Sequence, residues 1–130
     1  TITQRSNCLK AEVTKTNRSW NTSTVQQRQF LVKQWTVLNI GECPWTTDFT
    51  IVHWNGTLFQ PLPAVKNFHQ PVEPGGFFII TFEFKAPEEI GQYQSRWMMR
   101  SPTGQFFGIG VSDTPLYIEL NVKQAAEDDD

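Results

Sequence analysis

The chain has 130 residues and a net charge of −2 at pH 7, so one domain is expected and a basic surface for nucleic acid is not. Hydrophobic residues make up 38% of the chain and aromatic residues 13%, so a few large rings must supply much of the core. No run of apolar residues approaches the roughly 18 that a membrane span requires, so no membrane span is expected.

Charge is unevenly distributed along the chain. Residues 1–29 hold five basic residues and one acid, residues 30–122 hold five basic residues and eight acids, and residues 123–130 hold one lysine and four acids. We therefore predict a polar N-terminal arm at residues 1–29, with an edge strand at residues 8–14, a single β-domain at residues 30–122, and an acidic tail at residues 123–130.

The stretch at residues 30–45, FLVKQWTVLNIGECPW, carries the strongest strand signal. Both of its alternating sets are partly apolar, as expected of a strand inside a packed sandwich, so we predict a central strand here. Residues 49–54 also alternate, and Asn55-Gly56 follows them. That dipeptide predicts a hairpin turn, after which residues 57–59 return antiparallel.

Three later segments alternate in the same way. Their predicted inward sets are Phe78, Ile80, Phe82 and Phe84; Tyr93, Ser95, Trp97 and Met99; and Leu116, Ile118, Leu120 and Val122. Tyr93 is placed like the tyrosine of an Ig-type corner, whose hydroxyl bonds to backbone a few residues upstream. About seven strands without a helical period predict an all-β fold, an Ig-like or fibronectin-III-like two-sheet antiparallel β-sandwich, with Trp35 and Trp97 packed near each other.

Five motifs occur in a fixed order between residues 30 and 122. They are KQWTVLNIG followed by Cys43-Pro44-Trp45, PVEPG at 71–75, Ala86-Pro87, GQYQSRW at 91–97 and GQFFG at 104–108. In order and spacing they resemble the four-tryptophan (FW) Ig-like domain family, known as the central domain of selective-autophagy cargo receptors and also found in secreted bacterial proteins. The resemblance implies a binding module without chemistry. It also implies core aromatics at Trp35, Trp97 and Tyr117, the last standing at the family's fourth tryptophan.

The two cysteines, Cys8 and Cys43, would both lie near the ends of predicted strands. We predict a disulfide between them, whose loop closure would contribute roughly 3–4 kcal/mol. Such a bond would indicate an extracellular or cell-surface protein. Two free thiols in a reducing compartment are the alternative.

Three Asn-X-Ser/Thr sequons begin at Asn17, Asn21 and Asn55, on the predicted arm and hairpin turn. A glycan on such exposed segments would meet no packing, so these asparagines are candidate glycosylation sites in a competent host.

The aromatic residues Trp45, Trp54 and Phe59 gather around two predicted loops. Either these rings cap the sandwich core, or they are exposed anchors for a protein partner or a sugar ring. They are therefore the candidate binding residues.

Catalytic and metal-binding patterns are lacking in the sequence. His53 and His69 lie in different segments without an HExxH spacing, and no nucleophile elbow occurs. The aspartates at 128–130 form a charge run of the kind that is usually solvated. We expect no enzymatic activity, no metal and no cofactor.

We therefore predict a non-enzymatic Ig-like interaction and structural module of an extracellular, glycosylated protein. Its expected partners are proteins, above all copies of itself, and glycans. The positive arm and negative tail would join copies through terminal arms and open sheet edges into a filament or surface structure. Two alternatives stay open: the cargo-binding domain of an autophagy receptor, and a carbohydrate-binding module that stacks sugars on Trp54 or Trp45.

Overall fold

The computed structural model describes residues 8–16 and 24–124, and nine strands lie within them. The strands are β1 (Ala11–Thr16), β2 (Thr24–Gln26), β3 (Phe30–Asn39), β4 (Thr50–Gly56), β5 (Val65–Asn67), β6 (Phe77–Lys85), β7 (Gly91–Arg100), β8 (Phe106–Phe107) and β9 (Leu116–Lys123). The strands β2, β5 and β8 have two or three residues each, too few to display an alternation in the sequence.

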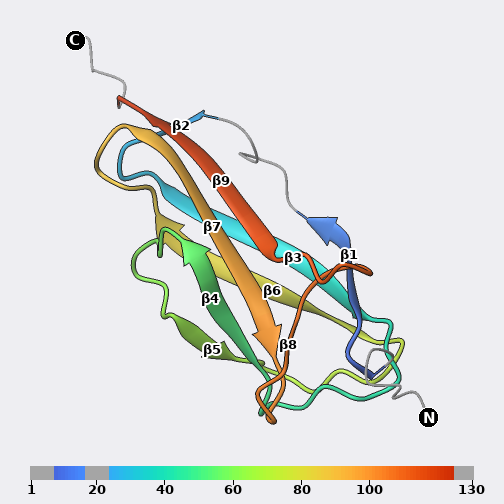
Figure 1. Cartoon of the computed structure of the whole chain (residues 1–130). Helices are drawn as coiled ribbons and strands as arrows, with labels where there is room; N and C mark the ends of the chain where they lie inside the picture. The colour runs from blue at the N-terminus through green and yellow to red at the C-terminus, as the bar shows by residue number, and fades with distance from the viewer. Residues whose placement is uncertain (1–7, 17–23, 125–130) are drawn as a thin grey trace.

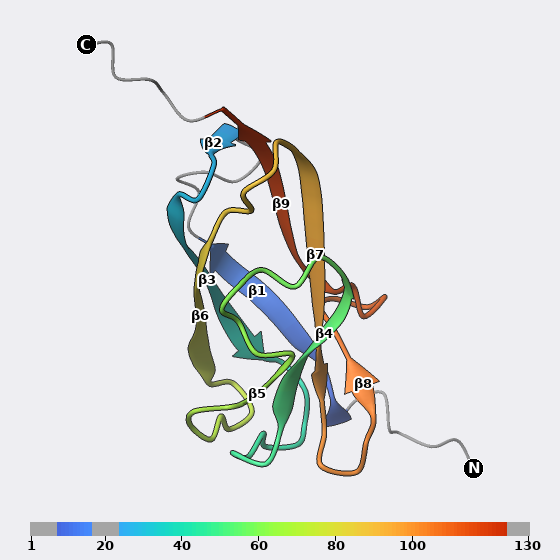
Figure 2. The same ribbon diagram turned by 90° about the vertical axis from the view of Figure 1, so that its left-hand side faces the viewer.

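The strands form two sheets that pack face to face (Figures 1 and 2). One sheet has three strands in the order β1-β3-β6, and the other has six, in the order β2-β9-β7-β4-β5 with β8 attached to β7. The strand pairs are antiparallel except for β2 and β9, which run parallel. The predicted two-sheet β-sandwich is thus confirmed.

The core consists of the inward side chains of the long strands. The predicted inward residues of β6 and β9 are all buried, because alternate side chains of a strand point to the same face. Phe82 of β6 contacts two of the buried tryptophans, with ring centroids 5.3 Å from Trp35 and 4.6 Å from Trp97. The hydroxyl of Tyr93 donates to the carbonyl of Glu89 at 2.7 Å, which confirms the expected corner.

The predicted hairpin at Asn55-Gly56 is wrong. Gly56 pairs with Ser95 of β7, and the next residue, Thr57, donates its backbone N–H to the carbonyl of Gln94 at 2.7 Å. Gly56 has a φ of +86°, and a Cβ there would collide with the backbone of Gln94. The glycine therefore permits a close approach to β7, and the chain that leaves β4 returns antiparallel to it only at β5.

The predicted edge strand of the N-terminal arm is present as β1, although it begins and ends later than expected. It pairs with β3, whereas β2, which the sequence did not indicate, pairs with β9 (Figure 1). The arm thus contributes one strand to each sheet. Most of the acidic tail, along with Asn17 and Asn21, lies outside the described residues.

The disulfide between Cys8 and Cys43 is present, with the two Cα atoms 4.8 Å apart. A Cβ on Gly41 would collide with the backbone of Cys8, so the turn after β3 passes directly against the start of the arm. The bond fixes the segment before β1 to the segment after β3 and confirms the predicted pairing.

Candidate binding surface

The outer face of the six-stranded sheet carries a group of exposed rings and two arginines. Ser95, Trp97 and Met99 fill the inward positions of β7, so the alternation turns Arg96 and Arg100 outward. We define the aromatic–arginine surface as Trp54, Arg96, Arg100, Phe106 and Tyr117, which come from β4, β7, β8 and β9.

One row of this surface crosses three strands, because Arg96 pairs with Asn55 on one side and with Tyr117 on the other. The guanidinium carbon of Arg96 lies 5.0 Å from the Tyr117 ring centroid, and Nη1 donates to Oδ1 of Asn55 at 3.3 Å. Burial and the nearby negative charge of Glu119 raise the pKa of Tyr117. A hydrogen bond between the phenol and the Glu119 side chain contributes to the same shift.

The second row contains Arg100 and its partner Phe106, with the guanidinium carbon 5.7 Å from the ring centroid. Trp54 lies where the register of β4 shifts between His53 and Asn55, which indicates a bulge. Its ring centroid is 5.0 Å from that of Phe106, in an edge-on arrangement. Trp54 keeps 45% of its surface exposed, so it remains available for a partner.

The electrostatics of this surface are set by the two arginines. Within the described part of the chain, the ion pair joins Arg28 to Glu88, and neither Arg96 nor Arg100 takes part in one. Each guanidinium is held against a ring by a cation–π contact, which leaves N–H groups at its edge for another acceptor.

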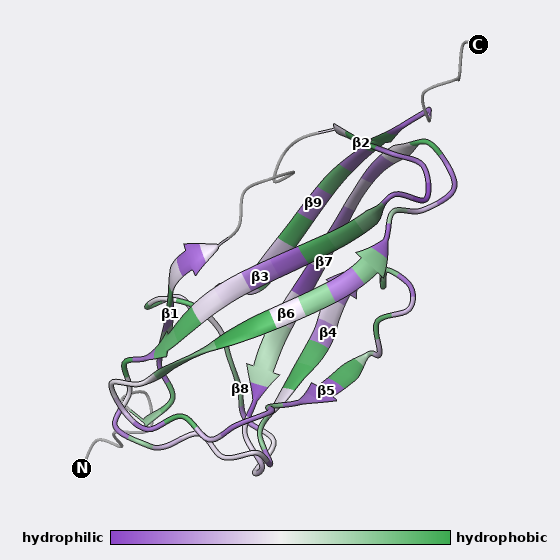
Figure 3. Cartoon of the chain, turned by 180° about the vertical axis from the view of Figure 1, so that it is seen from behind, coloured by the Kyte–Doolittle hydropathy of each residue, from purple (hydrophilic) through white to green (hydrophobic). Residues whose placement is uncertain are grey.

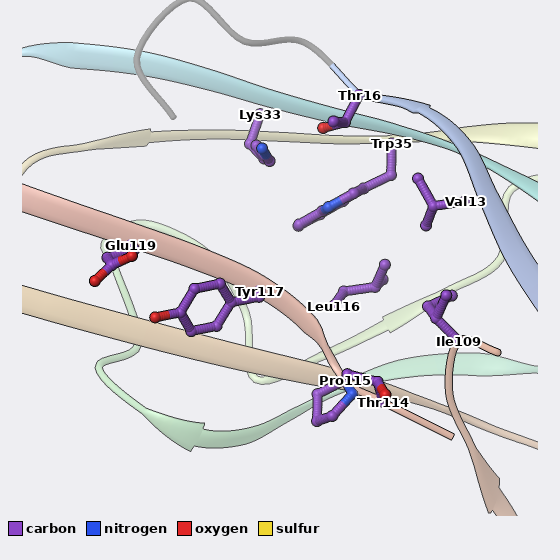
Figure 4. Close-up of a pocket in the computed structure, with 10 residues that line it drawn as sticks. All are labelled: Val13, Thr16, Lys33, Trp35, Ile109, Thr114, Pro115, Leu116, Tyr117 and Glu119. Atoms are coloured by element: carbon purple, nitrogen blue, oxygen red, sulfur yellow. The ribbon is translucent and has the colours of Figure 1, made fainter. Parts of the chain in front are cut away.

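A cavity of about 330 Å³ opens between the two sheets (Figure 4). Lys33 and Trp35 project into it from β3, and Val13, Ile109 and Leu116 add an apolar lining. Lys33 is only 2% exposed, its Nζ lies 5.7 Å from the Trp35 ring centroid, and burial lowers the pKa of the ammonium group. Glu119 also lines the cavity, which thus combines an apolar wall with one buried cation and one carboxylate.

The three candidate binding residues Trp45, Trp54 and Phe59 differ in their exposure to solvent. Trp45 and Phe59 are buried, so of the two alternatives they belong to the core, and their listing as candidate binding anchors is wrong. Trp45 packs against Phe68, Phe78 and Phe107 inside the sandwich, while Phe59 stacks on Phe84. Phe78 lies at the start of β6 and Phe84 near its end, so the two rings are buried at opposite ends of the core. Trp54 alone of the three remains at the surface.

Tyr117 is also placed differently from its expected core position. The inward positions of β9 are taken by Leu116 and Ile118, so Tyr117 points outward and is 37% exposed. Trp35 and Trp97, by contrast, are buried.

Arg96, Arg100 and Phe106 were not recognised as site residues from the sequence. The signal that could have found the arginines is their spacing on one face of an alternating strand.

Asn55 is exposed near the end of β4, where its side chain accepts the hydrogen bond from Arg96. Its sequon therefore lies in a strand beside the aromatic–arginine surface, not at a hairpin tip.

The two histidines lie against different rings. His53 contacts Trp97 at 5.2 Å between centroids and His69 contacts Phe78 at 5.5 Å. In residues 8–16 and 24–124, no three His, Cys, Asp or Glu side chains gather closely enough to hold a metal ion. The same residues contain no helix with the length and apolarity to cross a membrane.

The exposed apolar residues of the other sheet form a separate feature. The first half of β6 is hydrophobic (Figure 3), and its residues Phe77 and Ile79 are exposed. Leu38 pairs with Phe77 across the strands and is half-buried. Glu12 of β1 pairs with Leu38, so an exposed carboxylate borders this apolar area.

Comparisons with known proteins agree with the architecture. The model of a family described as "Ig-like domain from next to BRCA1 gene" matches residues 19–122. The solution structure of the CARDB domain of PF1109 from Pyrococcus furiosus is similar, with a TM-score of 0.57 and 16% identity over 88% of this chain and 96% of that domain. At this identity the likeness concerns the fold alone.

Two crystal structures of a beta-glucosidase from Listeria innocua are also similar in part. They have TM-scores of 0.48 and 0.42 and 15% identity, and each match covers 16% of the enzyme chain against 91% and 89% of this chain. A likeness this small says nothing about the activity of this chain. None of the curated proteins compared with the chain matches it.

Proposed function

This chain belongs to the family of the Ig-like domain from next to BRCA1 gene, and from that premise we propose that it is a non-enzymatic protein-binding module of an extracellular protein. The observation that carries the proposal is the aromatic–arginine surface, which lies on a rigid sheet instead of a loop. Tryptophan, tyrosine and arginine are the residues most enriched at the centres of protein interfaces, because each combines a large contact area with a polar group.

The disulfide supports the extracellular location. Bonds of this kind persist in oxidising compartments and are rare in the reducing cytosol, whereas a cargo-binding domain of an autophagy receptor would hold two free cysteines. Assignment to the four-tryptophan type is part of the proposal. The burial of Trp35 and Trp97 supports it, while the outward Tyr117 departs from it.

Glycosylation and self-association complete the proposal. The exposure of Asn55 supports a glycan there. The opposite charges of residues 1–29 and 123–130 support a head-to-tail contact between copies, and the edge strands β5 and β6 offer places for an added strand. A heterologous contact of that kind propagates as a filament unless it closes a ring.

The protein-binding function can be tested with a library of displayed peptides. The wild-type module should enrich a set of related peptides, and Trp54→Ala should abolish their binding. Phe77→Ala is the matched control, because it removes an exposed ring from the opposite sheet and should leave binding unchanged. If no related peptides are enriched, or if the selected peptides bind Trp54→Ala as well as the wild type, this surface is not a protein-binding site.

Carbohydrate binding is the second candidate, and the exposure of Trp54 is the observation that favours it. An indole face can stack on a sugar ring without help from a charged group. A glycan array distinguishes the two functions. Binding of neutral glycans that is lost in Trp54→Ala but kept in Arg96→Gln and Arg100→Gln supports the carbohydrate function and contradicts the protein-binding one.

A further inference from the structure

We propose that the aromatic–arginine surface binds an extended acidic peptide segment that lies along β7. Acidic side chains at positions i and i+4 of the segment meet Arg96 and Arg100, and an apolar side chain at position i+2 packs on Trp54. The inference rests on the proposed protein-binding function and names the class of partner that this surface takes.

The first step is the state of the two guanidinium groups. Neither forms an ion pair among the described residues, and each is supported on one side by a ring. A planar guanidinium held in this way is preorganised to donate two parallel hydrogen bonds to a carboxylate. Arg96 already donates through Nη1 to Asn55, and its remaining N–H groups are available for a ligand.

The second step is the spacing. Arg96 and Arg100 are four residues apart on one strand, so their Cα atoms are separated by about 13 Å. An extended peptide has the same rise per residue, and its positions i, i+2 and i+4 share one face. A peptide parallel or antiparallel to β7 therefore brings two carboxylates to the two arginines without a bend.

The third step is the apolar contact between the two charges. The register places Trp54 between the Asn55–Arg96 row and the Thr50–Arg100 row, with its ring beside Phe106. Met98, the β7 residue between the arginines, is covered from solvent although it too points outward. The centre of the surface is therefore apolar, and an apolar side chain at position i+2 would complete it.

The charges around Arg96 and Arg100 determine which of the two arginines binds a peptide carboxylate more strongly. Glu119 lies beside Tyr117, on the side of Arg96, and its negative charge opposes a second carboxylate there. No acidic side chain lies within ion-pair distance of Arg100 among the described residues, and Arg100 is exposed. Arg100 should accordingly be the stronger of the two contacts.

The experiment is an NMR titration of the full chain with a capped seven-residue peptide. The peptide has glutamate at its second and sixth positions, leucine at its fourth and threonine elsewhere. We expect the indole N–H signal of Trp54 to shift, and we expect the affinity to fall about tenfold when both glutamates are replaced by glutamine. A third peptide, with glutamates at the second and fifth positions, places them on opposite faces and should also bind weakly.

Three variants test the assignment of the residues. Arg100→Gln should weaken binding about tenfold and Arg96→Gln by a smaller factor. Lys85→Gln, which removes the same charge from an exposed position on β6, should change it by less than about twofold. The heteronuclear spectrum of each variant confirms that its fold is unchanged.

Equal binding of the glutamate and glutamine peptides, or equal effects of Arg100→Gln and Lys85→Gln, overturns the inference. If displayed peptides that depend on Trp54 prove to lack the acidic pair, the protein-binding function stands and this inference fails. If no peptide binds while a neutral glycan shifts the Trp54 signal, both fail. Single-stranded DNA that competes with equal strength shows that the arginines recognise any polyanion, which also contradicts the proposal.

Discussion

Phe82 links the two sheets, because its ring contacts a tryptophan from each of them. Phe82→Ala should lower the free energy of unfolding by roughly 3–5 kcal/mol, the usual loss when a buried phenylalanine site is emptied. Chemical denaturation measures it. Phe77→Ala, on the exposed face of the same strand, is the control and should cost far less. Similar losses for the two variants would contradict the observed register of β6.

Lys33 is unusual as a charged side chain in an inward position of a central strand. Burial lowers its pKa below the ordinary 10.5. Below the folded-state pKa the ammonium is charged in both states, so the full desolvation cost of folding is present. Above 10.5 the amine is neutral in both states, and the cost is gone. Stability contributed by Lys33 therefore rises with pH between these two values.

Lys33→Met removes this titration while keeping a side chain of similar length. The difference in unfolding free energy between Lys33→Met and the wild type should shift in favour of the wild type as the pH rises from 7 towards 10.5. Urea denaturation across this pH range measures it. Lys85→Met, at an exposed position, should show no such trend. A difference that is constant with pH for Lys33→Met would contradict the buried ammonium.

At the scale of the strands, the end of β4 depends on a glycine. Gly56→Ala should destabilise the domain by more than Gly75→Ala, although the two glycines have nearly equal φ angles of +86° and +85°. At Gly75 a Cβ meets nothing within 4 Å, so only the conformational cost of about 1–2 kcal/mol applies. At Gly56 the collision with Gln94 adds to it. Thermal and urea unfolding of the two variants compare them, and equal losses would argue against the close approach.

The long strands could be predicted from the sequence because each buries one face. This burial requires apolar and polar residues to alternate, and the alternation is visible in the sequence alone. The strand β2 could not be predicted, since three residues carry no period and it pairs with residues of β9 that lie 97 positions later in the chain. The hairpin prediction at Asn55-Gly56 failed because a glycine in the sequence has two possible roles. It can occupy a turn that reverses the chain, or it can allow two strands to approach closely, and the sequence alone does not distinguish them.

The candidate site was only partly predictable for a related reason. Trp45, Trp54 and Phe59 all lie near predicted loops, yet the rings that bury Trp45 and Phe59 come from distant strands. Exposure is therefore decided by tertiary contacts that no local pattern contains. The outward positions of Arg96 and Arg100 follow from alternation alone. Their support by Tyr117 and Phe106 depends on strand pairing.

At the scale of the whole molecule, the described strands begin at Ala11 and end at Lys123. Removal of residues 1–7 and 125–130 should therefore leave a folded domain, because no strand of the sandwich is cut. If copies of the chain associate through arm and tail, the truncated protein should be a monomer at concentrations where the full chain assembles. Light scattering and electron microscopy measure this. Persistence of the same assembly would place the contact on the sheet faces instead.

The disulfide between Cys8 and Cys43 also determines how the molecule would respond to tension. A pull applied at Cys8 passes directly to Cys43, so the residues between them, which include β1, β2 and β3, carry none of the load along the chain. While the bond is intact, the residues between the two cysteines cannot be extended by the pull. Reduction of the bond allows this segment, with a sequence separation of 35, to unfold under tension and adds up to roughly 120 Å to the length of the chain. In a surface structure under mechanical stress, the bond would hold this length in reserve until a reductant releases it.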